Sequence, residues 1–261
     1  MKINRMKKKI EALMIGILLC GGALTAQAQI GEHRNDFSIG GNGGYVMSNV
    51  KFQPDVPQKQ HGGFSGGFSM RYACEKYFKT ICSIYAEVNY SQVGWKEDIL
   101  DIDNNPVIIS ETQQPMAYTR TINYVQVPVM AHLAWGREVR GLNIFVNAGP
   151  QFGIYLGDKA TTNFDVKHMP GTDNDRVNNV VAQDTMAVKN KLDYGIAVGL
   201  GAEYSIPKVG HFLLEARYYY GLGNIYGSSK RDYFGTSNYN QIVVKLAYLF
   251  DITRTKNVKR K

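Results

Sequence analysis

The sequence predicts an all-β protein, an eight-stranded antiparallel up-and-down β-barrel that crosses a membrane. Apolar residues alternate with a period of two between clusters of Gly, Pro, Asn and Asp, without a convincing helical period of 3.6 residues. The connections between these segments alternate between short and long. One face of several segments is bulky and apolar, whereas the other is almost stripped to glycine. These three observations are typical of a barrel inserted into a bilayer from one side.

Residues 1–28 are predicted to be a signal peptide for export. A basic stretch precedes an apolar run from Leu13 to Leu24, and Ala26–Ala28 reads AQA, a small-x-small cleavage pattern. The apolar run is too short for a convincing membrane-spanning helix. The alternative is a lipoprotein acylated at Cys20, although Leu19 fills the preceding position, where a small residue is usual.

Eight strands are expected within a barrel domain of residues 29–252. Most have room for the roughly 9–11 residues that a tilted strand needs to cross a bilayer. Their expected ranges are 36–49, 63–75, 80–95, 119–135, 142–156, 192–206, 212–226 and 239–252. The connections after the second, fourth and sixth strands are short, and the others are long and polar. This sorting predicts tight turns at one rim and large loops at the other, which a Greek-key sandwich does not require.

The segment Tyr194–Tyr204, YGIAVGLGAEY, shows the two faces most clearly. One parity carries Tyr, Ile, Val, Leu and Ala, and the other carries mainly glycine. Lipid offers no water to polar side chains, so the apolar parity is expected to face the acyl chains. The glycine parity is expected to face a narrow lumen, where an eight-stranded barrel has space only for side chains.

Charges of both signs are predicted to lie in this lumen. The residues with inward parity are Arg71, Glu87, Glu203, Glu215, Arg217 and Lys245. Three acids and three bases favour a paired network that fills the interior, because unpaired charges there would be costly. The functional alternative is a path for protons or ions. Aromatic residues near the strand ends predict two interfacial girdles, and they include Tyr45, Trp95, Trp135, Tyr226 and Tyr248.

Cys74 and Cys82 are a candidate disulfide. They flank the EKYFKTI reversal symmetrically about Phe78, and an exported pair enters an oxidising compartment. A tight hairpin there would place the two residues opposite one another on one face, as a staple at the rim rather than a redox centre.

The basic charge of the chain is concentrated at its ends. Of 30 Lys and Arg residues, five lie in residues 1–28 and five in the tail, residues 253–261. The body is therefore nearly neutral and gives no reason to expect a nucleic acid partner. The tail is expected to be a solvated end.

No enzyme, cofactor or metal site is predicted. The five histidines are scattered without metal-ligand spacing, and no phosphate-binding glycine loop is expected. Asp101–Asn105, DIDNN, resembles the start of a calcium loop, but Pro106 and Thr112 stand where the turn glycine and the bidentate Glu belong. This segment and Gly171–Arg176 are interpreted as acidic outer loops.

Four segments resemble the PorT family of outer-membrane barrels of Bacteroidota. They are Asn123–Gly136, with a Tyr-x-x-x-Pro strand, Asn143–Lys159, with a Gly-Pro strand, the Gly-rich Leu192–Tyr204, and Glu215–Tyr226. The resemblance implies an outer-membrane barrel and, through the founding member, a role in type IX secretion. It implies no catalytic or binding residues. The cysteine pair and the eleven residues after Phe250 depart from the expected pattern.

The sequence therefore predicts a structural or accessory protein of the outer membrane with both termini in the periplasm. The expected partners are outer-membrane lipid, the barrel-assembly machinery during insertion and components of type IX secretion. A small-solute channel is the first alternative. A secreted lipocalin-like binding barrel is the second, and it would need an apolar lumen and a polar exterior.

Overall fold

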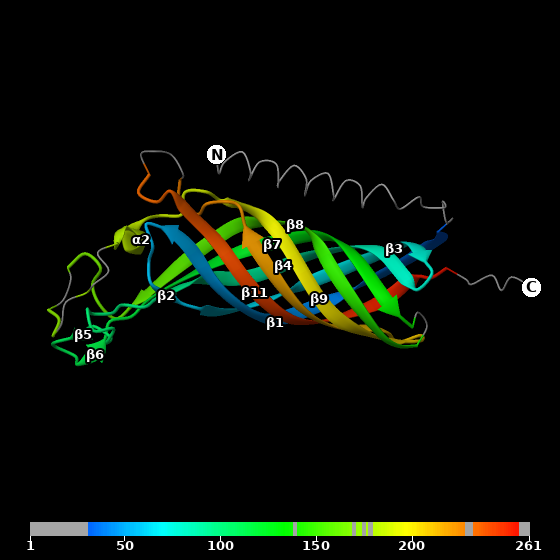
Figure 1. Ribbon diagram of the computed structural model, residues 1–261, viewed down its shortest axis with the longest axis horizontal. Coiled ribbons are helices and arrows are strands. Elements are labelled where there is room, and N and C mark those ends of the chain that lie inside the picture. The colour runs from blue at the N-terminus through cyan, green and yellow to red at the C-terminus, as the bar shows by residue number, and fades with distance from the viewer. Residues whose placement is uncertain are drawn as a thin grey trace, which may run out of the picture. The chain divides into compact units, whose positions relative to one another are not determined.

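Eight long strands form the wall of a closed barrel in the computed structural model, which describes residues 31–137, 140–168, 171–173, 176, 180–227 and 232–255 (Figure 1). The long strands are β1 (Glu32–Gln53), β3 (His61–Tyr77), β4 (Thr80–Glu97), β7 (Tyr118–Gly136), β8 (Gly141–Thr162), β9 (Leu192–Ile206), β10 (Gly210–Gly221) and β11 (Thr236–Thr253). Each is hydrogen-bonded to the next long strand of the chain, and β1 pairs with β11 to close the ring. The predicted all-β, up-and-down barrel is confirmed.

All eight predicted strands are present, but two of them end well away from the expected residue. β8 continues to Thr162, six residues beyond the expected end at 156. β10 ends at Gly221, five residues before the expected end at Tyr226. The chain turns there because the backbone N–H groups of Leu222 and Gly223 both donate to the carbonyl of Tyr194, at 2.8 and 3.1 Å. Tyr226 then folds back over the barrel instead of continuing the strand.

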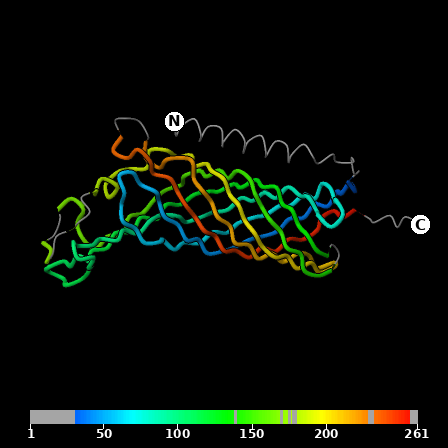
Figure 2. The backbone as a smooth tube through the Cα atoms, in the orientation of Figure 1, coloured from blue at the N-terminus to red at the C-terminus, as the bar shows by residue number. Residues whose placement is uncertain are grey.

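The loops are sorted by length as predicted. The short connections from β3 to β4, from β7 to β8 and from β9 to β10 lie at one rim, where β1 also begins and β11 ends (Figure 2). The long loops gather at the other rim and contain β2 (Gln58–Lys59), β5 (Ile108–Ile109), β6 (Gln114–Pro115) and a short helix, α2 (Ala182–Thr185). No helix among the described residues is long and apolar enough to cross a membrane.

The long loops contribute buried apolar side chains to the hydrophobic core, which the sequence interpretation missed. These side chains come from three loops, and they are Val56, Ile99, Val107, Ile109, Met116 and Phe164. These apolar residues lie in segments without a regular period, so no pattern in the sequence marks them as buried. The long-loop rim is therefore a folded cap rather than a set of solvated loops.

The two faces of the wall have the predicted polarity. On β9, the outward Val198 and Leu200 are 49% and 67% exposed, whereas the inward Ala197 is fully buried. The residues of outward parity on β8 are likewise exposed, and they are Ile144, Val146, Ala148, Phe152 and Ile154. The exterior is thus a band of bulky apolar side chains, as a lipid-facing surface requires.

The inward glycines of β9 make room for large side chains from other strands. A Cβ on Gly195 would lie 2.8 Å from the ring of Tyr219, and one on Gly199 would collide with the carboxylate of Glu215. The interior is filled to the backbone at these positions. The inward face of β9 carries glycines because side chains from other strands fill the lumen next to it.

Two residues assigned to the aromatic girdles lie inside the barrel instead. Trp95 and Tyr226 are fully buried, whereas Tyr45, Trp135 and Tyr248 are exposed on the outer surface as predicted. Trp95 has the same parity as the inward Glu87 on β4, so its inward orientation follows from the alternation of the strand. Tyr226 belongs to a loop that covers the barrel mouth.

The predicted disulfide is absent, because Cys74 and Cys82 are both free thiols. The hairpin register shifts between Ala73 and Glu75, so that Glu75 rather than Cys74 pairs with Cys82. Cys74 is the extra residue of a β-bulge, and a bulged residue has no direct cross-strand partner. The symmetry about Phe78 on which the prediction rested is thereby broken.

The predicted signal peptide, residues 1–28, lies outside the described residues, as does the tail from residue 256 onward. The described barrel begins at β1 and ends at β11, close to the expected limits of 29 and 252.

Candidate functional site: the charged interior of the barrel

Four buried charges form a central cluster in the lumen, consisting of Glu87, Glu215, Arg217 and Lys245. The guanidinium of Arg217 donates to Glu87 Oε2 at 2.8 Å and to Glu215 Oε1 at 2.9 Å. Lys245 contacts Glu87 and lies 3.4 Å from Glu215 Oε2. Two anions and two cations therefore neutralise one another in the middle of the barrel.

Polar side chains complete the hydrogen bonding of this cluster. Asn89 donates to Glu87 at 2.8 Å, and Asn147 donates to Glu215 Oε1 at 3.0 Å. All four charged side chains are at most 4% exposed. Burial of ions is tolerated only where geometry and hydrogen bonds offset the desolvation cost, and this cluster meets both conditions.

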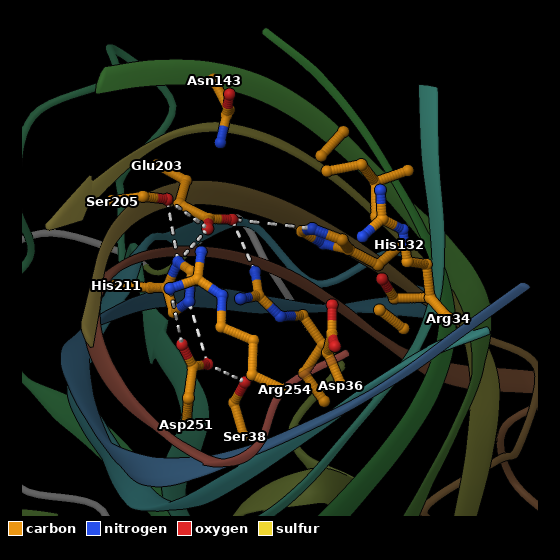
Figure 3. Close-up of a pocket in the computed structure, with 15 residues that line it drawn as sticks. Arg34, Asp36, Ser38, His132, Asn143, Glu203, Ser205, His211, Asp251 and Arg254 are labelled. Carbon is orange, nitrogen blue, oxygen red and sulfur yellow. Dashed lines mark hydrogen bonds and ion pairs between the residues drawn. The ribbon is translucent and has the colours of Figure 1, made fainter. Parts of the chain in front are cut away.

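A second group of charges lines a pocket at the short-turn rim (Figure 3). Glu203 accepts from Arg71 at 2.6 Å and lies 2.6 Å from His211 Nδ1. The other ring nitrogen of His211 lies 3.0 Å from Asp251, which also accepts from Ser38 at 2.7 Å. The pocket has a volume of about 40 Å³, enough for a few water molecules at most.

Ser205, His211 and Asp251 in this pocket have the outline of a hydrolase triad. Ser205 Oγ lies 2.8 Å from His211 Nδ1, and His211 Nε2 lies 3.0 Å from Asp251. A triad histidine must accept the serine proton, which requires a free lone pair. Here Glu203 also faces Nδ1, so both ring nitrogens face carboxylates and act as donors. The arrangement is that of an ion-paired histidine, and Ser205 Oγ donates to Glu203 Oε1 at 3.1 Å.

An aromatic layer closes the lumen toward the long-loop rim. Phe52 packs against Trp95 with ring centroids 5.3 Å apart, and against Phe234 at 4.8 Å. Tyr226 stacks on Phe234 at 5.6 Å. All of these rings are nearly or fully buried. This layer of packed, buried rings lies between the central cluster and the long-loop rim.

The segment 180–186, which contains α2, lies over this layer as a lid. Arg120 anchors it by donating to the carbonyls of Gln183 and Met186, at 3.1 and 2.6 Å. Arg120 is itself held by Asp158 at 2.7 Å. The side chain of Gln183 is buried and donates to Glu97 at 2.7 Å.

Asp184 in the lid adjoins a second carboxylate. Burial, and then the neighbouring Glu97, raise the pKa of Asp184 to about 8, against the opposing effect of Arg176 and Arg120. Asp184 is therefore largely protonated at neutral pH. Asp184 Oδ2 also lies 3.9 Å from Arg176 Nη1, and Arg176 in turn contacts Glu97 at 2.9 Å.

All six charges predicted for the lumen are buried there, but they divide between the two groups just described. Arg71 and Glu203 belong to the pocket, and the other four belong to the central cluster. Sequence reasoning missed His132, His211 and Asp251, which join them. His132 Nδ1 contacts Asn147 at 2.7 Å, and its other nitrogen lies 3.8 Å from Glu203. The inward parity of both histidines was the signal that could have revealed them.

The described residues contain no group of three or more His, Cys, Asp or Glu side chains arranged to hold a metal ion. In the calcium-like DIDNN segment, Asp101 Oδ1 accepts from the backbone N–H groups of Asp103 and Asn105, at 2.9 and 2.8 Å. The carboxylate thus stabilises the turn of its own loop.

An apolar exterior, a closed antiparallel wall and an ion-paired interior define the class of transmembrane β-barrels. The sequence model of the outer membrane protein beta-barrel domain matches residues 27–227. The chain belongs to this family of outer-membrane proteins.

Several solved structures are similar in fold. Neisserial surface protein A shares 11% identity over 82% of this chain and 96% of its own, with a TM-score of 0.40. Ail of Yersinia pestis, solved with the heparin analogue sucrose octasulfate, shares 14% over 82% and 99%, with a TM-score of 0.35. OprG of Pseudomonas aeruginosa shares 14% over 85% and 96%, with a TM-score of 0.34. None of the curated protein sequences compared with the chain matches it.

Proposed function

We propose that this outer-membrane protein has a structural or accessory role in the cell envelope and does not conduct solutes. The observation that carries the proposal is the filled lumen. The central cluster occupies the middle of the barrel, and the aromatic layer and the lid lie between it and the long-loop rim. Eight-stranded barrels have interiors just wide enough for side chains, so these groups leave no continuous aqueous path.

Planar-bilayer recording tests this proposal. The purified full chain is expected to give no steady current above the lipid background. A matched variant that lacks the lid, residues 180–186, should also remain closed, because the central cluster and the aromatic layer persist. A steady pore of nanosiemens size in the native chain would instead establish the small-solute channel.

The pocket geometry supports a non-enzymatic role. Both nitrogens of His211 face carboxylates, and Ser205 is buried beside Glu203. The lipocalin-like alternative receives no support, because it requires the opposite distribution of apolar and polar residues between exterior and lumen.

We further propose that the long loops face outward and that both termini lie in the periplasm. β1 begins and β11 ends at the short-turn rim, opposite the folded loops (Figure 1). Barrels of this class have short periplasmic turns and longer extracellular loops.

Labelling of intact cells tests this orientation. In a background with Cys74 and Cys82 replaced by Ser, the exposed Lys167→Cys in a long loop should react with a membrane-impermeant maleimide. The matched Lys208→Cys in a short turn should react only after lysis. The reverse pattern contradicts the orientation.

Within the envelope, we propose a part in type IX protein secretion, which rests on the sequence resemblance to the PorT family alone. Partners would be components of that apparatus, in addition to lipid and the assembly machinery. Deletion of the gene should abolish export of cargo that carries the type IX sorting domain. Unchanged cargo export in the deletion strain leaves only the general envelope role.

A further inference from the structure

We infer that a basic crevice on the outer wall, at the long-loop rim between the end of β10 and the start of β9, binds the phosphorylated headgroup of an outer-leaflet lipid. The crevice has a volume of about 520 Å³, and the residues that matter for binding are Lys189, Asn190, Lys191, Leu192, Tyr194 and Leu222. The inference rests on the proposed outward orientation of the long loops.

The crevice has an apolar part and a basic part that lie next to each other. Its lower part is apolar, with Leu192, Tyr194 and Leu222 between 47% and 58% exposed on the lipid-facing surface. Tyr194 begins the outward apolar row that continues down β9. The upper part carries the two lysines. A lipid with acyl chains against the row and phosphate at the lysines matches both parts.

The two lysines differ in their charge environment. Lys189 Nζ lies 3.0 Å from Asp232, and its side chain remains 61% exposed. Lys191 is exposed and forms no ion pair with an acidic side chain within the described part of the chain. Lys191 therefore offers a full positive charge, whereas Asp232 offsets part of the charge of Lys189.

The backbone holds this segment in place before any ligand arrives. The N–H groups of Lys189 and Asn190 both donate to the carbonyl of Ile225 at 3.1 Å, and the N–H of Tyr155 donates to the carbonyl of Lys191 at 2.8 Å. The side chain of Asn190 donates to the carbonyl of Asn224 at 2.8 Å. These hydrogen bonds thus fix the backbone of the segment that precedes β9 and lines the crevice.

The charge pattern favours a phosphate-bearing lipid over a free phosphate ion. Lysine binds phosphate as a point charge, and Lys189 and Lys191 both line the crevice. A free ion would gain nothing from the apolar lower part, whereas acyl chains would bury it. Each lysine near an anionic membrane surface strengthens lipid binding by about fivefold.

The test uses the purified full chain in detergent, titrated with bis-phosphorylated lipid A and with the same lipid after removal of its phosphates, and followed by native mass spectrometry. The phosphorylated lipid is expected to bind at least fivefold more tightly. Lys191→Gln should weaken its binding by about fivefold, and Lys189→Gln should weaken it less. Lys96→Gln, an exposed lysine on β4 outside the crevice, is the matched control and should change nothing.

Several results would overturn the inference. These are equal affinity for the two lipids, an unchanged affinity in Lys191→Gln, or an equal loss in Lys96→Gln. Displacement by millimolar inorganic phosphate would show a free-ion site instead. Because binding in detergent does not depend on orientation in the cell, failure here is distinct from failure of the labelling experiment.

Discussion

Glu87 shows how closely the stability of this barrel depends on single charges. Its side chain is fully buried and contacts both Arg217 and Lys245. Replacement by glutamine would remove the negative charge and leave two cations facing one anion, Glu215. Loss of one partner of a buried ion pair costs about 3–5 kcal/mol.

The Glu87→Gln variant is therefore expected to unfold at markedly lower urea concentration. Urea titration of the barrel in lipid vesicles, followed by the fluorescence of Trp95 and Trp135, measures this change. Glu111→Gln in an exposed loop position is the control, for which about 0.5 kcal/mol or less is expected. Equal stability of Glu87→Gln and the native chain would show that the cluster does not stabilise the barrel.

Asp184 makes the attachment of the lid dependent on pH. Its pKa is raised in the closed lid to about 8, above the ordinary value of 3.8 expected once the lid is released. The protonated form therefore favours the closed lid. This stabilisation is fully present below about pH 4 and is lost as the pH rises toward 8.

Hydrogen exchange at the amides of Asp184 and Met186, which donate within the α2 turn, measures this effect. Comparison with Asp184→Asn at the same pH cancels the intrinsic pH dependence of exchange. The native chain should exchange faster relative to the variant at pH 8.5 than at pH 5.5. A ratio that does not change with pH would argue against a protonated Asp184 in the closed lid.

The sequence predicted which charges enter the lumen but not how they pair. Parity along one strand fixes the direction of a side chain, so the inward orientation of Arg71 and Glu203 could be predicted. Their ion pair joins strands that lie 132 residues apart in the chain. Such a pair depends on the register of several strands at once, which no local pattern specifies.

Among the single elements, β9 shows most clearly how the lumen-facing and lipid-facing residues of a strand differ. Its inward Gly199 leaves room for Glu215, whereas its outward Val198 meets no such limit. Replacement of Gly199 by valine would force the carboxylate of Glu215 out of the central cluster. Overpacking of this kind typically costs about 1–3 kcal/mol.

Gly199→Val should therefore lower the urea midpoint, and the matched Val198→Leu on the lipid face should leave it almost unchanged. Both variants are compared in the same vesicles. Equal effects at the two neighbouring positions would mean that β9 does not separate lumen from lipid.

The long strands were predictable because a bilayer imposes length and alternation on them together. The bulge at Cys74 and the helix α2 were not. A bulge changes the register by one residue without altering the local composition, which left the symmetry about Phe78 as a misleading signal. α2 has only four residues and is held by Arg120 from β7 rather than by its own helix propensity.

For the whole molecule, the exterior band predicts how the barrel sits in lipid. Fluorophores attached at Val198→Cys and Leu246→Cys, both outward and exposed, should be quenched by lipids that carry a nitroxide on the acyl chain. A label at Ile102→Cys, which is exposed in a long loop, should be quenched much less. Quenching that is strongest at residue 102 would invert the proposed placement.

The overall architecture was the most predictable property, since period, loop sorting and face polarity all favoured one fold. The folded cap was the least predictable, because its buried side chains come from loops distant in sequence. Long-range packing, and not the strands, therefore limits how much of the structure can be predicted from the sequence.

The pairing of β1 with β11 has a consequence for biogenesis. Phe37 lies beside Thr253 and Gln53 lies beside Thr236, so the seam joins the first long strand of the described barrel to its last. Until β11 pairs with β1, the incomplete sheet has two edge strands with unpaired backbone N–H and C=O groups. Each edge can pair with a strand of another chain. The chain therefore needs guarding through its entire synthesis and export, and a truncation just before residue 236 would yield an aggregation-prone fragment instead of a smaller pore.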